Sequence, residues 1–140
     1  MNDAFQQIPW SEIERLVKVL SKKISSMPRH FSSISTISRG GLVPARLLAD
    51  NLGMDIIYVD RNKIPSDSLF VDDIYDSGNT FKKIISKSED PTHLVYATLF
   101  ARHGKKFPKQ LIFAKQTKAN EYIVYPWDKL EFKRLQKLGM

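Results

Sequence analysis

Residues 69–80 hold the feature that most constrains what this chain can fold into. An apolar run from Leu69 ends in the carboxylates Asp72 and Asp73, and a small polar loop then leads into a helix-like segment from Phe81. This order predicts a strand, a loop and a helix N-terminus. A helix N-terminus exposes unpaired N–H groups and partial positive charge, which favour an anion. We therefore expect the loop to bind a phosphate group.

The side chains around this loop suit two parts of one ligand. Ser77 and Thr80 supply hydroxyl donors for a phosphate, and Gly78 lets the backbone come close to it. The carboxylates of Asp72 and Asp73 repel a phosphate, so we expect them to hold sugar hydroxyls or a magnesium ion. A phosphate, a polyhydroxyl and a metal together describe a phosphorylated sugar. The alternative is an ordinary strand end with a polar turn, which an Asp-Asp pair alone would indicate.

A second unit with the same order lies upstream. Residues 33–38 are rich in β-branched side chains and predict a strand, which leads into Arg39-Gly40-Gly41 and then a helix over 45–51. Two glycines expose bare backbone N–H groups and the arginine adds a fork of charged donors, a combination that suits pyrophosphate. The loop lacks the Lys-Ser/Thr ending of a P-loop. A plain Gly-Gly turn is the alternative.

Together the two loops resemble those of the type I phosphoribosyltransferases. These enzymes bind phosphoribosyl pyrophosphate (PRPP) with a hydrophobic strand, two acids and an Asp-Thr-Gly-Gly-Thr loop, which here runs from Asp76 to Thr80 with Asn79 in place of a glycine. Residues 38–44 closely match the pyrophosphate loop of the bacterial xanthine-guanine members of the family. Both motifs stand in the family's order, and the resemblance covers about 34–128.

The resemblance implies a purine salvage reaction. A purine base attacks the anomeric carbon of PRPP, pyrophosphate leaves, and a nucleoside monophosphate forms with the help of Mg²⁺. Asp76 would accept the proton of the base, and Asp72 and Asp73 would hold the ribose, directly or through the metal. The implied PRPP-binding residues are Arg39, Gly40, Asp72, Asp73, Asp76, Ser77, Gly78, Asn79 and Thr80.

Three further positions match those that select a 6-oxopurine (xanthine, guanine or hypoxanthine) in the family. Arg102 follows an expected strand over 92–101, where the related enzymes place a lysine that donates to the purine carbonyl oxygen. Tyr122 and Ile123 match an aromatic-Ile pair just before a Pro-Trp-Asp turn, where the aromatic stacks on the purine. By itself, an aromatic at such a position would more often be part of the core.

The alternation of strand and helix patterns predicts one α/β domain over 1–140, with a mostly parallel twisted sheet flanked by helices. The first helix is expected over 11–26, with Ser11 and Glu14 as a capping box, and a basic terminal helix over 129–138. The site is expected at the carboxyl ends of the strands. Against the family pattern, the connection over 60–68 is short where related enzymes carry a longer mobile loop that closes over the reacting centre.

Charge and composition limit the binding partners and the cellular compartment that we expect. The net charge is +7, and residues 101–140 account for all of it with ten Lys or Arg against three Asp or Glu. Such a segment attracts a polyanion such as PRPP, and without an RNA-binding signature or zinc finger we do not expect a nucleic-acid partner. The chain has no cysteine, no long apolar run and no signal-like N-terminus, which favours the cytoplasm.

A non-catalytic alternative stays open at this stage. A PRPP- or nucleotide-binding regulator on the same fold, including one that binds RNA, would also keep the acids and the phosphate loop. The short 60–68 connection and the basic C-terminal portion favour it. Turnover of a labelled purine separates the two classes. The resemblance further implies a homo-oligomer, either a dimer or a tetramer.

Overall fold

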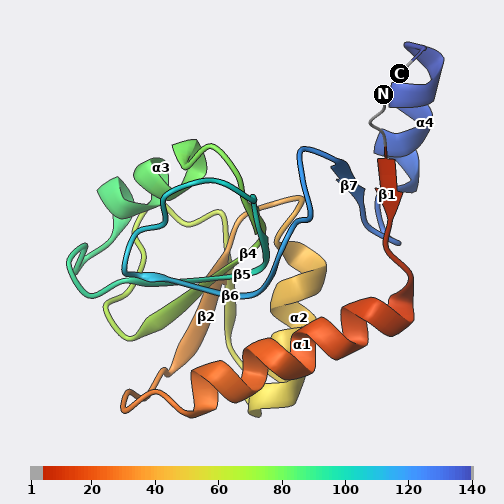
Figure 1. The fold of residues 1–140 in the computed structure, drawn as a ribbon. Coiled ribbons are helices and arrows are strands. Elements are labelled where there is room, and N and C mark those ends of the chain that lie inside the picture. Colours follow the sequence, from red (N-terminus) through yellow and green to blue (C-terminus); the bar gives the residue numbers. More distant parts are fainter. Residues whose placement is uncertain (1–4, 140) are drawn as a thin grey trace.

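The computed structural model describes residues 5–139 and is built around a parallel sheet of five strands with the order β3-β2-β4-β5-β6 (Figure 1). Along the chain the elements are β1 (Phe5–Gln7), α1 (Trp10–Ser25), β2 (Ser33–Thr36), α2 (Leu42–Leu52), β3 (Ile57–Val59), β4 (Ser68–Tyr75), α3 (Asn79–Lys87), β5 (Val95–Ala101), β6 (Leu111–Gln116), β7 (Tyr122–Val124) and α4 (Lys129–Lys137). The α/β architecture expected from the sequence is confirmed.

Helices cover both faces of the sheet, and a separate core lies under each face. The apolar stripe of α1 (Ile13, Leu16, Val17, Leu20 and Ile24) is buried and packs, with α2, in the larger core. On the other face α3 packs over a smaller core that contains Phe70 and Tyr96. Every residue of β5 is buried, as expected for an interior strand of a parallel sheet covered on both faces.

The expected capping box of the first helix is wrong. Helix α1 begins at Trp10, so Ser11 lies inside the helix and the N-cap position belongs to Pro9. The Pro9 carbonyl accepts the backbone N–H groups of Glu12 and Ile13 at 3.0 and 3.2 Å. The first helical turn therefore closes on the carbonyl of Pro9, two residues before the expected Ser11 cap.

The expected end of the central strand also needs correction. The two acids lie inside β4, because its pairing with β5 continues past them through Ile74 and Tyr75. The carbonyl of Tyr75 accepts the Arg102 N–H at 2.8 Å. The phosphate-type loop therefore starts at Asp76, and helix α3 starts at Asn79, two residues earlier than expected.

The two ends of the chain form a second small unit beside the main sheet. Strand β1 pairs in parallel with β7, with Phe5 opposite Tyr122. The ring of Phe132 on α4 meets the Phe5 ring edge-on at 5.3 Å. Figure 1 shows β1, β7 and α4 together, beyond the carboxyl-terminal end of the main sheet. No helix in the described part of the chain is long and apolar enough to cross a membrane.

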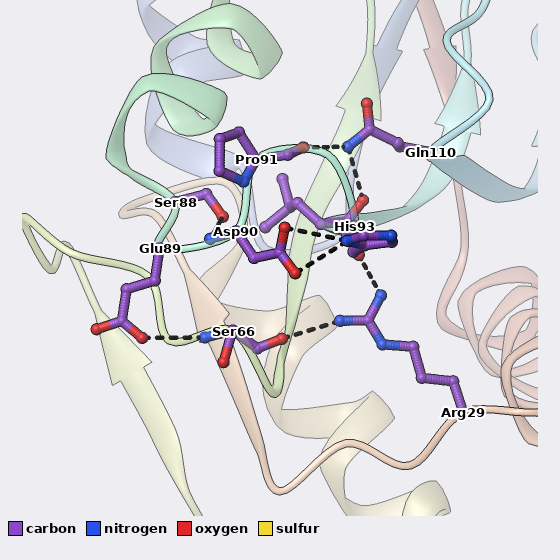
Figure 2. Close-up of polar contacts among 9 residues, drawn as sticks. Arg29, Ser66, Ser88, Glu89, Asp90, Pro91, His93 and Gln110 are labelled. Atoms are coloured by element: carbon purple, nitrogen blue, oxygen red, sulfur yellow. Dashed lines mark hydrogen bonds and ion pairs between the residues drawn. The ribbon is translucent and has the colours of Figure 1, made fainter.

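The amino-terminal edge of the sheet is held by a polar network that involves no part of the predicted site (Figure 2). Arg29 donates to the His93 carbonyl, and through its other terminal nitrogen to the Ser66 carbonyl at 2.9 Å. His93 contacts the Asp90 carboxylate at 3.0 Å. Because these residues precede β2, β4 and β5, the network ties together the segments that enter these strands, opposite the edge where the site is expected.

Candidate active site

Both predicted ligand loops lie at the carboxyl-terminal edge of the sheet, side by side. Strand β2 leads into residues 38–41, β4 leads into residues 76–78, and the two strands are direct parallel neighbours. Open α/β sheets bind ligands in the crevice outside this edge. The topology therefore brings together two motifs that are more than thirty residues apart in the sequence.

The phosphate-type loop has the shape of an anion cradle. Gly78 is the N-cap of α3 with φ 89°, and a Cβ there would lie 2.7 Å from the Tyr75 hydroxyl oxygen, so only glycine fits. Asn79 donates its N–H to Ser77 Oγ at 3.2 Å. The N–H groups of Gly78 and Thr80 have no protein acceptor within residues 5–139. These donors suit a phosphate, although phosphate binding by the loop stays a prediction.

The pyrophosphate-type loop is pressed against β4 by its two glycines. A Cβ on Gly41 would lie 2.0 Å from Thr36 Oγ1, and a Cβ on Gly40 would lie 2.7 Å from Asp73 Oδ2. The peptide bond between Ser38 and Arg39 is cis. The absence of side chains at both glycines thus allows the loop to reach the Asp73 carboxylate.

Asp60, which the sequence did not single out, holds the first residue of this loop. It follows β3 and has a left-handed φ of 53°, a conformation that Asp tolerates better than most residues. Its carboxylate accepts the Ser38 N–H at 2.9 Å and the Ser38 hydroxyl at 2.5 Å. These bonds lower the pKa of Asp60 and keep it ionised.

The two neighbouring acids of β4 differ in their surroundings. Asp72 is buried, and its two oxygens accept the Tyr96 hydroxyl at 2.9 Å and the Asp73 N–H at 2.8 Å. Asp73 is partly exposed and faces the pyrophosphate-type loop. Burial raises the pKa of Asp72, while burial and the charge of Asp72 raise the pKa of Asp73 well above its usual range. Direct contact with a ligand is therefore more open to Asp73 than to Asp72.

Asp76 and Arg102 form an ion pair at this edge. The Arg102 Nε donates to Asp76 Oδ1 at 3.2 Å, and its Nη1 donates to the Glu121 carbonyl at 2.7 Å. The arginine side chain is 11% exposed and the Asp76 side chain 55%. The buried guanidinium of Arg102 thus orients the exposed carboxylate of Asp76. It also fixes the backbone of Glu121, the residue before Tyr122. The sequence predicted both Asp76 and Arg102 but not their contact.

Tyr122 and Ile123 lie on β7, and their side chains differ in access. Tyr122 is 38% exposed and meets the ring of Phe5 edge-on at 5.8 Å. Ile123 is buried in the larger core. Only the backbone of Ile123 is therefore available to a base, and the purine-binding role of both residues stays a prediction.

A cleft of about 540 Å³ opens beside these residues. Arg39, Gly40, Asp73 and Asp128 line one part of it, and side chains of α4 line the rest. The sequence did not predict a role for Asp128 or α4. No local motif could have indicated one, because α4 reaches the cleft only through the packing of the chain ends.

No protein-family model matches the chain. Among curated proteins it is 26% identical to the xanthine-guanine phosphoribosyltransferase of Desulfotalea psychrophila, with 91% of each chain covered. It is 27% identical to the protein of the same name from Chromohalobacter salexigens, over 86% of this chain and 82% of that one. These relatives confirm the resemblance inferred from the two loops.

Solved structures show the same fold. The xanthine-guanine-hypoxanthine phosphoribosyltransferase of Helicobacter pylori matches with a TM-score of 0.72 at 19% identity, covering 96% of this chain and 99% of that one. A hypothetical protein from Neisseria gonorrhoeae with bound ppGpp matches with a TM-score of 0.71 at 22% identity, covering 100% and 99%. The expected fold, a mostly parallel sheet flanked by helices, is confirmed.

Proposed function

We propose that this chain, a relative of the xanthine-guanine phosphoribosyltransferases, transfers the phosphoribosyl group of PRPP to a 6-oxopurine in purine salvage. A ring nitrogen of the purine forms a bond to the anomeric carbon, the bond from that carbon to pyrophosphate breaks, and the nitrogen loses its proton. The observation that carries the proposal is the meeting of the two PRPP-type loops at adjacent strand ends, with Gly40 against the Asp73 carboxylate.

Each part of PRPP has a matching group in the site. The open N–H groups and hydroxyls of residues 77–80 suit the 5′-phosphate, with Gly78 giving the backbone close access. Arg39 and Gly40 suit the pyrophosphate, which the guanidinium fork can bind in a bidentate manner. The Asp73 carboxylate lies beside Gly40 of the pyrophosphate-type loop and suits the ribose hydroxyls.

The acids fit a magnesium ion that arrives with the substrate. Mg²⁺ is usually held by one or two carboxylates, several waters and substrate phosphates. The raised pKa of Asp73 has burial and the negative charges of Asp72 and Asp128 among its causes, so a cation there would relieve real repulsion. When bound, the ion neutralises charge on the leaving pyrophosphate.

We propose Asp76 as the acceptor of the proton that the base loses. Its carboxylate is open to solvent, and the ion pair with Arg102 fixes its orientation. The ribose gains positive charge as pyrophosphate leaves, so a fixed carboxylate beside it also stabilises the transition state. In this proposal Arg102, Tyr122 and Ile123 make the remaining contacts with the base. The ring of Tyr122 is exposed and can stack on the purine.

The deciding experiment measures turnover of PRPP with xanthine, guanine, hypoxanthine and adenine, with and without Mg²⁺. We expect nucleoside monophosphate and pyrophosphate in equal amounts from at least one 6-oxopurine, only with Mg²⁺, and none from adenine. Failure to consume any purine, by a folded protein that binds PRPP, would overturn the enzymatic function.

That negative outcome would favour the second candidate, a nucleotide-binding regulator. The short 60–68 connection supports it, and so does the similar fold of the neisserial protein with bound ppGpp. In that case we expect binding of a guanine nucleotide without turnover. In either case we propose a cytoplasmic homo-oligomer, dimer or tetramer, which light scattering after size-exclusion chromatography would test.

A further inference from the structure

We propose that Arg134 of the terminal helix α4 is a further binding residue for the pyrophosphate group of PRPP, acting across the cleft from Arg39. The proposal rests on the proposed function. It assigns a substrate contact to an element outside both ligand loops and outside the purine-binding positions.

The shape of the cleft places α4 opposite the pyrophosphate-type loop. Arg39 and Gly40 form one wall, and Leu130, Arg134 and Leu135 come from the helix. Leu130 and Arg134 are four positions apart and therefore share a face of α4, which lines the cleft together with the neighbouring Leu135. The cleft is therefore lined by residues of both the loop and this helix.

The hydrogen bonding of the arginines singles out the same two residues. Five other arginines within residues 5–139 have a partner: Arg15 and Arg46 pair with acids, Arg29 with carbonyls, Arg61 with a tyrosine ring, and Arg102 with an acid and carbonyls. In that same part of the chain, Arg39 and Arg134 have no acceptor for their side chains. Both unpaired guanidiniums thus line one cleft.

Two unpaired guanidiniums facing one space match the oxygens of a pyrophosphate. Each presents five donors in a rigid fork that fits phosphate oxygens. The carboxylates of Asp73 and Asp128 in the same cleft oppose a bare anion. We therefore expect the ligand to be the magnesium complex of pyrophosphate, because the cation would offset the charge of these two acids.

The anchoring of α4 does not depend on Arg134. Phe132 packs on Phe5, and its N–H donates to the Asp128 carbonyl at 3.0 Å. Arg134 is exposed, so its side chain is free to bind a ligand without unfolding the helix.

The test compares Arg134→Ala and Arg134→Lys with the matched control Lys133→Ala, an exposed cation on the same helix that does not line the cleft. Calorimetry on the full chain measures the affinity for magnesium pyrophosphate and, separately, for guanosine monophosphate. Loss of a hydrogen bond to a charged group predicts about tenfold to a hundredfold weaker pyrophosphate binding by Arg134→Ala. Arg134→Lys should recover part of it, and Lys133→Ala should bind like the wild type.

The monophosphate separates a local contact from a structural effect. We expect its affinity to stay within about twofold in Arg134→Ala, because its phosphate uses the other loop. Unchanged pyrophosphate binding in Arg134→Ala, or an equal loss for both ligands, would overturn the role of Arg134. If the wild type bound neither ligand nor PRPP, the proposed function itself would fail.

Discussion

At the scale of single residues, Asp76 separates chemistry from binding. Asp76→Asn keeps the shape and an oxygen acceptor for Arg102 but removes the charge that, in the proposed function, takes the proton. We expect turnover to fall roughly a hundredfold to ten-thousandfold while PRPP affinity stays within severalfold. Steady-state kinetics and PRPP binding on the same variant check this. Full activity would remove Asp76 from the chemistry, and a parallel loss of binding would make it a sugar or metal ligand.

A second residue-scale prediction follows from the repulsion between the neighbouring acids. The raised pKa of Asp73 means that its ionised form is disfavoured in the folded, ligand-free protein. Asp73→Asn removes that charge, so we expect the melting temperature of the free protein to rise by a few degrees. PRPP turnover should fall strongly in the same variant. Calorimetric melting without ligand checks the first part, and a lower melting temperature would contradict it.

At the scale of elements, Glu12 links α1 to the edge strand β6. Its carboxylate accepts Arg15 Nε at 2.8 Å and lies 3.3 Å from Lys115 Nζ on β6. The bond from Arg15, with a smaller effect of Lys115, lowers the pKa of Glu12 to about 2. The ionised form is therefore favoured in the folded chain. Its stabilisation is complete above the unfolded pKa, near 4.5, and is lost as the pH falls toward 2.

Glu12→Gln should therefore destabilise the protein at pH 7 and lose this effect at low pH. We expect a modest loss, below about 1 kcal/mol, because both partners are partly exposed and solvent screens them. Urea unfolding at pH 7 and at pH 2.5 measures it, with Glu14→Gln as a control for an exposed acid on the same helix. An equal difference between Glu12→Gln and wild type at both pH values would contradict the assignment.

The elements that the sequence predicted well are those set by local pattern. The stripe of α1 and the strand–loop–helix order around Gly78 depend on residues close in the chain, and both are confirmed. The pairing of Phe5 with Tyr122 and the contact of Asp76 with Arg102 could not be predicted. Each joins residues far apart in the sequence, and the short polar β1 carries no strand pattern of its own.

At the scale of the whole molecule, the two chain ends contribute to the proposed site, whose two ligand loops come from the middle of the chain. Strand β7 carries Tyr122, α4 lines the cleft, and both depend on β1 for their packing. Phe5 contacts both elements through its ring, edge-on to Tyr122 at 5.8 Å and to Phe132 at 5.3 Å. The main sheet does not include β1. Weaker packing among β1, β7 and α4 should therefore reduce ligand binding more than it destabilises the main core.

Phe5→Ala tests that dependence. Deletion of the ring removes both aromatic contacts, each worth about 0.5–1.5 kcal/mol beyond buried area, so we expect β7 and α4 to open more often. Amide hydrogen exchange should quicken in residues 122–137 and stay unchanged in β4 and β5. The KM values for both PRPP and the purine should rise together. In the proposed site, α4 lines the pyrophosphate cleft and β7 carries the residues that contact the purine. Phe113→Ala, which removes an aromatic contact outside this unit, is the control. Faster exchange throughout the main sheet in Phe5→Ala would show instead that the chain ends stabilise the whole fold.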